Sequence, residues 1–295
     1  MRQHYLLINP KGGYKKGLEI FERVRDVFRK TNTKLTVLHT EYAGHAFDLA
    51  NTLDFSKHDG LCAIGGDGTM YEMINGMLKR KDKKIIPIGL ITGGTGNSFM
   101  YDVECLDPVE AARRIVKYNL RPLDIAKVDA NGELFYAFNI VGWGLATDAG
   151  KLAEKLRWLG GMRYNIASVI EVLKGKNRIA NLKLGKEEIK DNFIFVIGCN
   201  TMHTGKAMKM APLAKLDDGK IDLLIVRKTS RVNLLKLFPK LFSGEHVKSP
   251  LVEYRQVENF SISIEETNDL TIDGEIIGTT PLKVQMIPNM VNVLV

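Results

Sequence analysis

The chain has 295 residues, of which 45% are hydrophobic and 26% are charged. This composition is that of an ordinary globular protein, so collagen-like, disordered and disulfide-rich classes are excluded, and the length allows two domains. The net charge of +8 leaves three kinds of partner open: nucleic acid, an anionic membrane surface and an anionic substrate. Cys62, Cys105 and Cys199 form no CxxC pair, so the sequence indicates neither a disulfide framework nor a zinc site.

The N-terminal residues lack the pattern of a signal peptide, and no apolar run approaches the about 18–20 residues that a spanning helix needs. The scattered cysteines suit a reducing compartment, so we expect a soluble, cytoplasmic protein. The basic run at residues 79–84 is most simply a solvated turn, and attraction to a membrane surface is the alternative.

Strand-like and helix-like patterns alternate over residues 1–120. Apolar runs predict strands at 5–8, 35–38, 61–64 and 85–91, and apolar residues at helical spacing predict helices between them. This alternation is typical of a parallel sheet with helices on both faces. We therefore expect an α/β domain over residues 1–123, with ligands at the carboxyl ends of its strands.

The pattern changes after Pro122. Apolar runs with hairpin-length gaps predict strands at 125–128, 134–141, 179–184, 193–198, 221–226, 251–254, 260–264 and 270–273. Two helical stripes, at 152–159 and 166–173, interrupt these strands. The expected second domain, residues 124–282, is therefore mainly antiparallel β structure.

Glycine turns follow three of the expected parallel strands, at residues 9–13, 65–69 and 93–97. Glycine lets backbone N–H groups approach a phosphate closely, and turn amides together with a helix N-terminus form an anion site. Three such turns at strand ends indicate one polyphosphate lying across them. Neither a GxxxxGK[ST] nor a GxGxxG pattern occurs, which excludes P-loop enzymes and common dinucleotide-binding domains.

Asp67 lies between the glycines of the second turn. As a structural residue it would bind its own turn's backbone. As a functional residue it would place a carboxylate beside the phosphates, where it can hold a Mg²⁺-bound water or orient an attacking hydroxyl group.

Three runs, NPKGG (9–13), GGDGTMYEMINGML (65–78) and GGTGNSF (93–99), resemble the nucleotide-binding motifs of the diacylglycerol kinase catalytic-domain family. That family includes bacterial soluble diacylglycerol kinases, sphingosine kinases and ceramide kinases. PLAKLDDG (212–219), GEHVKSPLVEY (244–254) and TIDGE (271–275) match bacterial members in order and spacing. The resemblance therefore spans nearly the whole chain, although GGDGT by itself also occurs in NAD kinases.

The resemblance implies the family fold: an NAD-kinase- or diacylglycerol-kinase-like α/β nucleotide-binding domain, a β-sandwich-like second domain, and ATP in the cleft between them. Residues 283–295 would return to the first domain. The residues implied to line the ATP site are Asn9, Gly13, Lys15, Gly66, Asp67, Gly68, Thr69, Thr95 and Asn97.

Family roles also extend to the second half of the chain. Asp273 would be the general base that takes the proton of the lipid hydroxyl group, with Glu275 beside the phosphates and Asp67 as the rival base. Asp218 would hold a structural Mg²⁺ with the backbone carbonyls of Lys215 and Lys220. A further carboxylate, Asp124, would join that network through water.

At two places the sequence departs from the pattern of bacterial diacylglycerol kinases, and both places bear on which lipid is the expected acceptor. Ser98 stands where bacterial diacylglycerol kinases usually have Asp, and sphingosine kinases carry a small residue there. The segments WGLATD (143–148) and RWLGGMRY (157–164) resemble the lipid-facing segment of sphingosine and ceramide kinases, where Asp148 would bind the headgroup. The alternative for Asp148 is a helix N-cap. The apolar stripes of the two following helices would form part of an acyl-chain pocket.

The leading hypothesis is an ATP- and Mg²⁺-dependent lipid kinase whose acceptor is diacylglycerol or a sphingoid base. Its expected partner is a membrane lipid at an anionic bilayer surface, with peripheral association, no nucleic acid, and a homodimer left open. The alternatives are an NAD kinase, which shares the GGDGT turn, and a non-catalytic lipid- or nucleic-acid-binding protein, which only the charge of +8 suggests.

Overall fold

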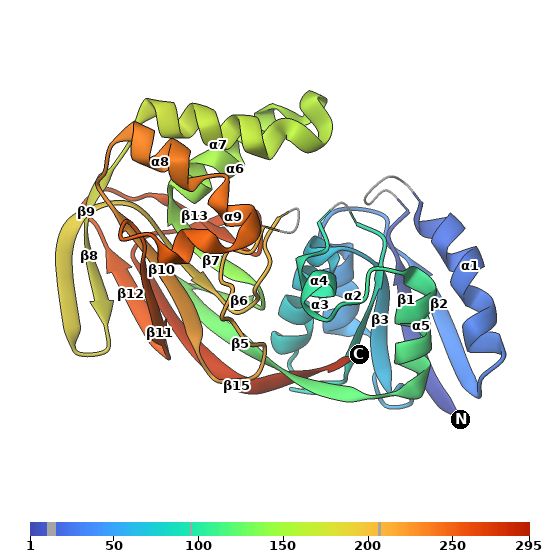
Figure 1. Ribbon diagram of the computed structural model, residues 1–295. Coiled ribbons are helices and arrows are strands. Elements are labelled where there is room, and N and C mark those ends of the chain that lie inside the picture. Colours follow the sequence, from blue (N-terminus) through green and yellow to red (C-terminus); the bar gives the residue numbers. More distant parts are fainter. Residues whose placement is uncertain (11–15, 95, 206–207) are drawn as a thin grey trace. The chain divides into compact units, whose positions relative to one another are not determined.

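The computed structural model describes residues 1–10, 16–94, 96–205 and 208–295, which form two compact units (Figure 1). Unit 1 comprises residues 1–125 and 288–295, and unit 2 comprises residues 126–287. The sequence patterns place the boundaries slightly earlier, at 123/124 and 282/283. The chain passes from one unit to the other inside two continuous strands, β5 (Leu120–Ala130) and β15 (Leu282–Leu294).

Unit 1 is built on a parallel sheet with the strand order β2-β1-β3-β4-β15. Its strands are β1 (Arg2–Ile8), β2 (Thr33–His39), β3 (Gly60–Gly65), β4 (Ile88–Thr92) and the end of β15, where Val293 pairs with Ile88. The central strands β1 and β3 are almost entirely buried, which is why their sequences are continuous apolar runs rather than alternating ones.

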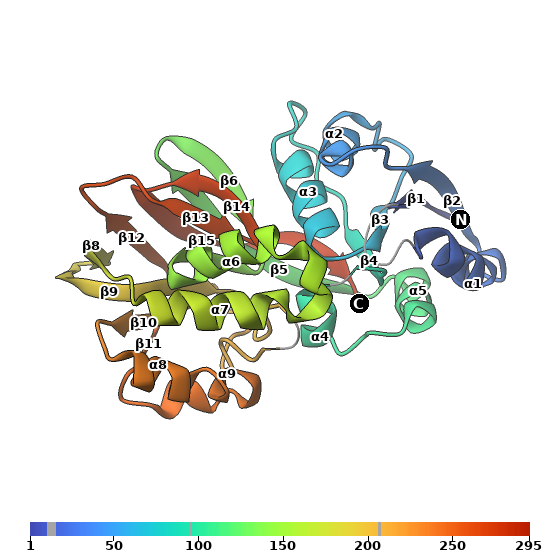
Figure 2. The same ribbon diagram turned by 90° about the horizontal axis from the view of Figure 1, so that it is seen from above.

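Helices cover both faces of this sheet, as Figure 2 shows. They are α1 (Gly17–Arg29), α2 (His45–Thr52), α3 (Asp67–Leu78), α4 (Ser98–Asp102) and α5 (Pro108–Lys117). α1 packs against α5, and α2 packs against α3. The parallel α/β architecture expected from the alternating pattern is confirmed.

Unit 2 is antiparallel throughout its described strand pairs. Its strands are β5, β6 (Glu133–Ala137), β7 (Ile140–Gly144), β8 (Arg178–Leu184), β9 (Glu187–Cys199), β10 (Ile221–Arg227), β11 (Glu253–Val257), β12 (Asn259–Ser263), β13 (Asp269–Ile272), β14 (Glu275–Thr279) and β15. The long strand β9 pairs with β7, β8 and β10 and so joins most of the unit.

The helices of unit 2 are α6 (Leu145–Lys155), the 3₁₀ helix η1 (Arg157–Met162), α7 (Arg163–Lys174), α8 (Arg231–Leu237), α9 (Lys240–Ser243) and the 3₁₀ helix η2 (Glu245–Lys248). α6 packs on β7, β9 and β13, and α7 packs on α6 and α8. The described part of the chain has no helix with the length and apolarity to span a bilayer.

Several sequence expectations need correction in unit 2. The single strand expected at 134–141 is two strands, β6 and β7, which a bend at Phe138 and Asn139 separates. The strand expected at 251–254 begins at Glu253, and β14, α8 and α9 were not expected. All three cysteines are free and buried, as expected of small apolar residues.

Candidate active site

The glycine turns of unit 1 follow β1, β3 and β4, which are adjacent in the sheet, so the turns meet at its carboxyl edge. The Asn9 N–H donates to the Ile64 carbonyl at 3.3 Å, and the Gly93 N–H donates to the Gly65 carbonyl at 2.8 Å. Three residues implied to line the ATP site, Gly13, Lys15 and Thr95, lie outside the described residues. The remaining turn residues are brought together at one sheet edge, as the sequence predicts.

The second and third turns pack backbone against backbone. A Cβ atom on Gly66 would lie 2.6 Å from the Gly96 carbonyl oxygen and 3.0 Å from the Gly94 Cα. Only glycine permits this approach. On the third turn itself, the Asn97 Nδ2 donates to the Gly94 carbonyl at 3.0 Å. Gly68 and Thr69 continue the first turn of α3, where Thr69 is buried.

The carboxylate of Asp67 ties these two turns together. Its Oδ2 accepts the Ser98 N–H at 2.8 Å, and its Oδ1 accepts the Phe99 N–H at 3.2 Å. The side chain is 9% exposed, and burial raises the pKa of Asp67 above its usual value. Asp67 therefore has a structural role, as in the first alternative, but it binds the first two residues of α4, directly after the third turn, rather than the backbone of its own turn. The same contact places Ser98, the departure in the third motif, directly against Asp67.

In unit 2, Asp273 lies in the two-residue turn of the β13–β14 hairpin. Asp273 and Gly274 have φ angles of 50° and 90°, the backbone of the type I′ turn that Asp-Gly favours. The Asp273 carboxylate is 5% exposed. Its Oδ2 accepts the Phe138 N–H at 2.9 Å, and its Oδ1 accepts the N–H groups of Asn139 and Ile140, each at 2.9 Å. The bend between β6 and β7 thus holds the expected base in one orientation. Glu275, the first residue of β14, is exposed.

A polar network that the sequence analysis missed supports this bend. The Asn200 Nδ2 donates to the Phe138 carbonyl at 3.0 Å, and the Asn200 N–H donates to the Asn139 carbonyl at 2.8 Å. The Thr201 hydroxyl donates to the Asn139 Oδ1. In the sequence, the signal for this network is the polar pair Asn200 and Thr201, which directly follows a buried strand.

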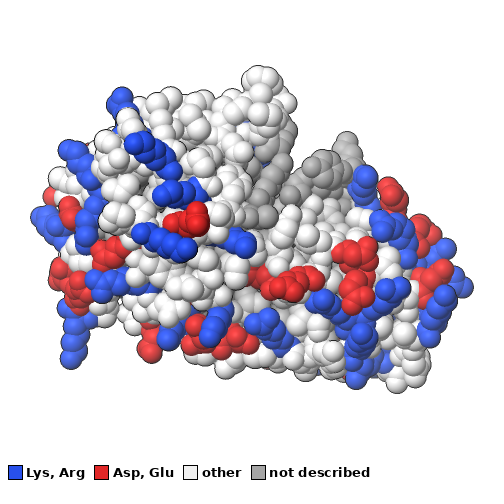
Figure 3. All heavy atoms as spheres, in the orientation of Figure 1, with Lys and Arg blue, Asp and Glu red and all other residues white. Residues whose placement is uncertain are grey.

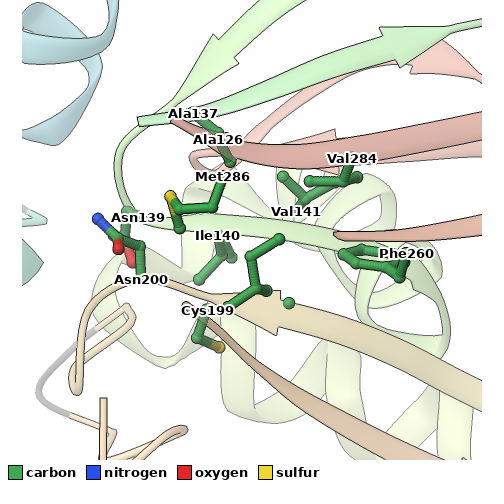
Figure 4. A pocket seen from close by; sticks show the side chains of 12 residues that line it. Ala126, Ala137, Asn139, Ile140, Val141, Cys199, Asn200, Phe260, Val284 and Met286 are labelled. Carbon is green, nitrogen blue, oxygen red and sulfur yellow. The ribbon is translucent and has the colours of Figure 1, made fainter. Parts of the chain in front are cut away.

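A small pocket lies behind the bend, with Asn139 and Asn200 together at one end and apolar side chains such as Phe260 and Val284 at the other (Figure 4). Its lining residues come from the strands and adjoining turns of unit 2, and no residue of α6 or α7 is among them. The helical stripes that the resemblance assigns in part to an acyl-chain pocket therefore do not line this pocket.

Asp148 lies in the first turn of α6, whose N-cap is Gly144, so the N-cap alternative for Asp148 is wrong. The Arg178 Nη2 donates to both carboxylate oxygens of Asp148, at 3.0 and 2.9 Å. The two side chains are 13% and 18% exposed. A cationic headgroup binding at Asp148 would have to compete with this guanidinium group.

Among the residues expected to hold Mg²⁺, Asp218 lies near a second carboxylate, Asp222, which the sequence did not single out. Asp218 Oδ1 accepts the Lys220 N–H at 3.1 Å. Asp222 is fully buried; its Oδ1 accepts the hydroxyl group of Tyr254 at 2.6 Å and the Nε2 of Gln256 at 3.0 Å. Burial, and then the negative charge of Asp218, raise the pKa of Asp222.

The Asp222 Oδ2 is buried without a hydrogen-bond partner among the residues that the structure describes. An unpaired buried carboxylate oxygen beside a second carboxylate is a site that a hard cation fits. No group of three or more His, Cys, Asp and Glu ligands occurs in the described part of the chain, so backbone carbonyls such as those of Lys215 and Lys220 would be needed. Asp124 lies in unit 1, where it accepts the Asn289 N–H at 2.7 Å.

Comparison with known proteins identifies the class to which this fold and these motifs belong. Residues 3–128 match the diacylglycerol kinase catalytic domain, and residues 139–295 match the YegS C-terminal NAD kinase beta sandwich-like domain. The α/β domain and the β-sandwich-like domain are those of lipid kinases. The chain belongs to the diacylglycerol kinase catalytic-domain family.

Its relatives include both sphingosine kinases and a diacylglycerol kinase. The chain is 28% identical to Sphingosine kinase 1 of Arabidopsis thaliana, over 92% of this chain and 68% of that protein, and it spans 63% of Sphingosine kinase 2 of the same plant. It is 27% identical to the diacylglycerol kinase of Bacillus subtilis, over 95% of this chain and 92% of the relative.

Solved structures share the fold. A diacylglycerol kinase from Bacillus anthracis superposes with a TM-score of 0.81 at 24% identity, covering 99% of this chain and 96% of the other. An NAD kinase from Archaeoglobus fulgidus in complex with ATP superposes with a TM-score of 0.51 at 13% identity, covering 99% and 93%.

Proposed function

We propose that this chain transfers the γ-phosphoryl group of ATP to a hydroxyl group of a membrane lipid. The observation that carries the proposal is the Asp67 carboxylate, which fixes the second glycine turn to the third. Phosphoryl transfer asks a protein mainly for positioning and charge neutralisation, and a rigid row of turn amides supplies both for a triphosphate. Membership in a family of kinases supports ATP as the donor.

We assign the general base to Asp273 and a positioning role to Asp67. Both Asp67 oxygens accept backbone N–H groups at the start of α4, directly after the third turn, so its carboxylate would hold the nucleotide-binding turns in place. Asp273 is held by three N–H groups at a hairpin turn, and Glu275 follows it on the exposed side. A base fixed in one orientation can take the proton of the acceptor hydroxyl group without first reorganising.

Asp218 would hold Mg²⁺ together with the carbonyls of Lys215 and Lys220, and the unpaired Asp222 oxygen supports a cation nearby. Bound Mg²⁺ supplies positive charge, which offsets the repulsion between these two buried or half-buried carboxylates. Asp124 accepts a backbone N–H of its own unit and needs no ion for that contact.

Between the two acceptor classes, the contact of Asp148 with Arg178 favours the neutral one. A sphingoid base carries an amine that a lone carboxylate would attract, but this carboxylate is already neutralised by a guanidinium group. A diacylglycerol presents an uncharged hydroxyl group and does not need that charge. We therefore propose diacylglycerol as the preferred acceptor, taken from a bilayer by a peripherally associated enzyme.

An NAD kinase is the second candidate, because the fold is similar to that of an NAD kinase in complex with ATP. Against it stand the TIDGE turn and the LDDG segment, which the sequence shares with bacterial diacylglycerol kinases.

Both candidates are tested by one screen with radiolabelled ATP. Mixed micelles containing diacylglycerol, monoacylglycerol, sphingosine or ceramide are offered separately, and NAD is offered in solution. We expect the strongest labelling with diacylglycerol. Labelling of sphingosine above diacylglycerol would overturn the acceptor assignment, and labelling of NAD alone would overturn the lipid kinase proposal.

A further inference from the structure

The helix α7 exposes its apolar side. Met162, Ile166, Val169 and Leu173 follow one another at intervals of three or four residues, so they form a single stripe on a helix of about 3.6 residues per turn. Met162 is 65% exposed and Leu173 is 50% exposed, while Ile166 and Val169 are half-buried. Ile170, beside this stripe, is 36% exposed.

The buried residues of α7 are Ala167, Glu171 and Val172. Ala167 and Glu171, which lie one turn apart on the opposite side from Val169, are almost completely buried. Glu171 is paired there with Lys174. A surface helix normally buries its apolar stripe and exposes its charges. α7 instead buries the charged Glu171 beside Ala167 and Val172 and leaves its stripe exposed or half-buried, so the stripe is available to a partner.

The turn before α7 continues the same exposure. Trp158 of η1 is 79% exposed, the highest value among the large apolar residues of the described chain. Tyr164, at the start of α7, is 39% exposed. We refer to Trp158, Met162, Ile166, Val169, Ile170 and Leu173 as the α7 face. A contiguous exposed apolar surface of this kind usually marks a protein or membrane interaction site.

The charged residues around the α7 face are mainly basic. Residues 145–176 contain six basic and three acidic residues. Each of the acidic residues, Asp148, Glu154 and Glu171, is paired with Arg or Lys. Lys155, which precedes the α7 face in the chain, and Lys176, which follows it, are both exposed. In the view of Figure 3 the ridge that α7 forms is drawn mostly in white, with blue at one end and no red along it.

We propose that the α7 face docks this chain on an anionic lipid bilayer. The apolar stripe would lie in the boundary between headgroups and acyl chains, with Trp158 at the interface, where indole rings are enriched. The exposed lysines would lie among lipid phosphates, each strengthening binding to an anionic surface about fivefold. The inference rests on the proposed function, because an acceptor held in a bilayer requires such contact.

A bilayer suits this face better than a second copy of the chain. Two copies meeting through the α7 face would bring their basic residues together, and like charges across an interface oppose association. An anionic bilayer is complementary to both the apolar stripe and the exposed lysines. A dimer is therefore an outcome that the experiment must exclude.

The two tryptophans allow a direct test, because Trp143 is fully buried whereas Trp158 is exposed. Vesicles of phosphatidylcholine with phosphatidylglycerol are added to the full chain, and the emission wavelength is recorded. We expect a blue shift that Trp158→Phe removes and that weakens as salt is raised. No shift with any vesicle, or a shift that survives Trp158→Phe, would overturn the proposal.

A matched pair of variants measures the affinity. Met162→Ser/Leu173→Ser should bind these vesicles about a hundredfold more weakly in cosedimentation, since each buried apolar side chain accounts for roughly tenfold. Leu18→Ser is the control, because Leu18 is 52% exposed on α1 and resembles Leu173 in exposure. We expect it to bind like the unsubstituted chain, and both variants to melt like it. Equal binding by the double variant would overturn the proposal.

Turnover separates this inference from the proposed function. The double variant should bind a fluorescent ATP analogue as tightly as the unsubstituted chain and phosphorylate a long-chain acceptor in vesicles at a much lower rate. If no acceptor is phosphorylated at all, the proposed function fails while vesicle binding remains independently measurable. If the double variant instead converts a dimer to a monomer in sedimentation velocity with vesicle binding unchanged, the α7 face is a self-association surface and the bilayer assignment is wrong.

Discussion

The guanidinium group of Arg178 contacts both carboxylate oxygens of Asp148 through one nitrogen, Nη2. Arg178 belongs to β8 and Asp148 to α6, so the pair fastens a helix to a strand of the same unit. Both side chains are mostly buried. The contact neutralises the one carboxylate that the sequence offers for an amine headgroup.

Arg178→Gln should therefore destabilise the chain and change its acceptor preference. Removing one partner of a mostly buried ion pair leaves an uncompensated charge, which costs about 3 kcal/mol. Urea unfolding measures this cost, and Asp148→Asn/Arg178→Gln should recover part of it. The ratio of turnover on sphingosine to turnover on diacylglycerol should rise in Arg178→Gln. An unchanged ratio would remove Asp148 from the acceptor site.

Asp67→Ala separates the positioning role of Asp67 from the role of a base. The variant leaves the Ser98 and Phe99 N–H groups without their acceptor, so the third glycine turn loses its tie to the second. We expect nucleotide affinity to fall together with kcat. Binding of a fluorescent ATP analogue and steady-state kinetics measure the two effects. Normal nucleotide binding with kcat alone reduced would instead make Asp67 the base.

Asp273→Asn should lose most turnover, by about 10² to 10⁴-fold, because an amide cannot take the proton. It should also unfold at a lower urea concentration. The amide nitrogen would face an N–H group of the bend at residues 138–140, at a cost of about 1–3 kcal/mol. Glu275→Gln is the control for stability, because Glu275 is exposed. Near-normal turnover of Asp273→Asn would move the base to another residue.

Mg²⁺ should raise the melting temperature of the unsubstituted chain, and a chelator should reverse the rise. Asp218→Ala and Asp222→Asn should both abolish this response, because each removes a carboxylate from the proposed cation site. Asp217→Asn is the matched control on an exposed neighbour in the chain. A Mg²⁺ response that survives both substitutions would place the ion elsewhere.

His4 should make the stability of unit 1 depend on pH. Burial lowers the pKa of His4 from 6.5 to about 4. Between these values the unfolded chain binds a proton that the folded chain does not, so the free energy of unfolding falls as the pH falls, by up to about 3 kcal/mol. Unfolding in urea at several pH values measures the slope. His4→Gln should reduce it, and an unchanged slope would contradict the assignment.

The sequence predicted the α/β half well because its strands are buried on both faces. Such strands are continuous apolar runs, and glycine turns mark their ends. Since β1, β3 and β4 are neighbours, the described residues that begin the three turns lie at one edge of the sheet. α5 was missed although its signals were present: Asp107 caps it by accepting the Glu110 N–H, and Pro108 opens it.

In the second half of the chain, the features that the sequence does not predict depend on contacts between residues far apart in the chain. The apolar run at 134–141 reads as one strand because the group that bends it, Asp273, lies far along the chain. The neutralisation of Asp148 depends equally on Arg178, which no local pattern connects to it. The Asp-Gly pair before β14 is also a local hairpin signal, and it accounts for the β13–β14 hairpin without any long-range contact.

Because β15 supplies residues 288–295 to unit 1, that unit cannot be completed from the N-terminal part of the chain. During synthesis on the ribosome, the contacts of Asp124 with the Asn289 N–H and of β4 with Val293 can form only after the residues of unit 2 have been translated. A fragment ending near residue 125 would expose the edge of β4 and invite aggregation. Unit 1 can therefore be completed only after unit 2 has been translated.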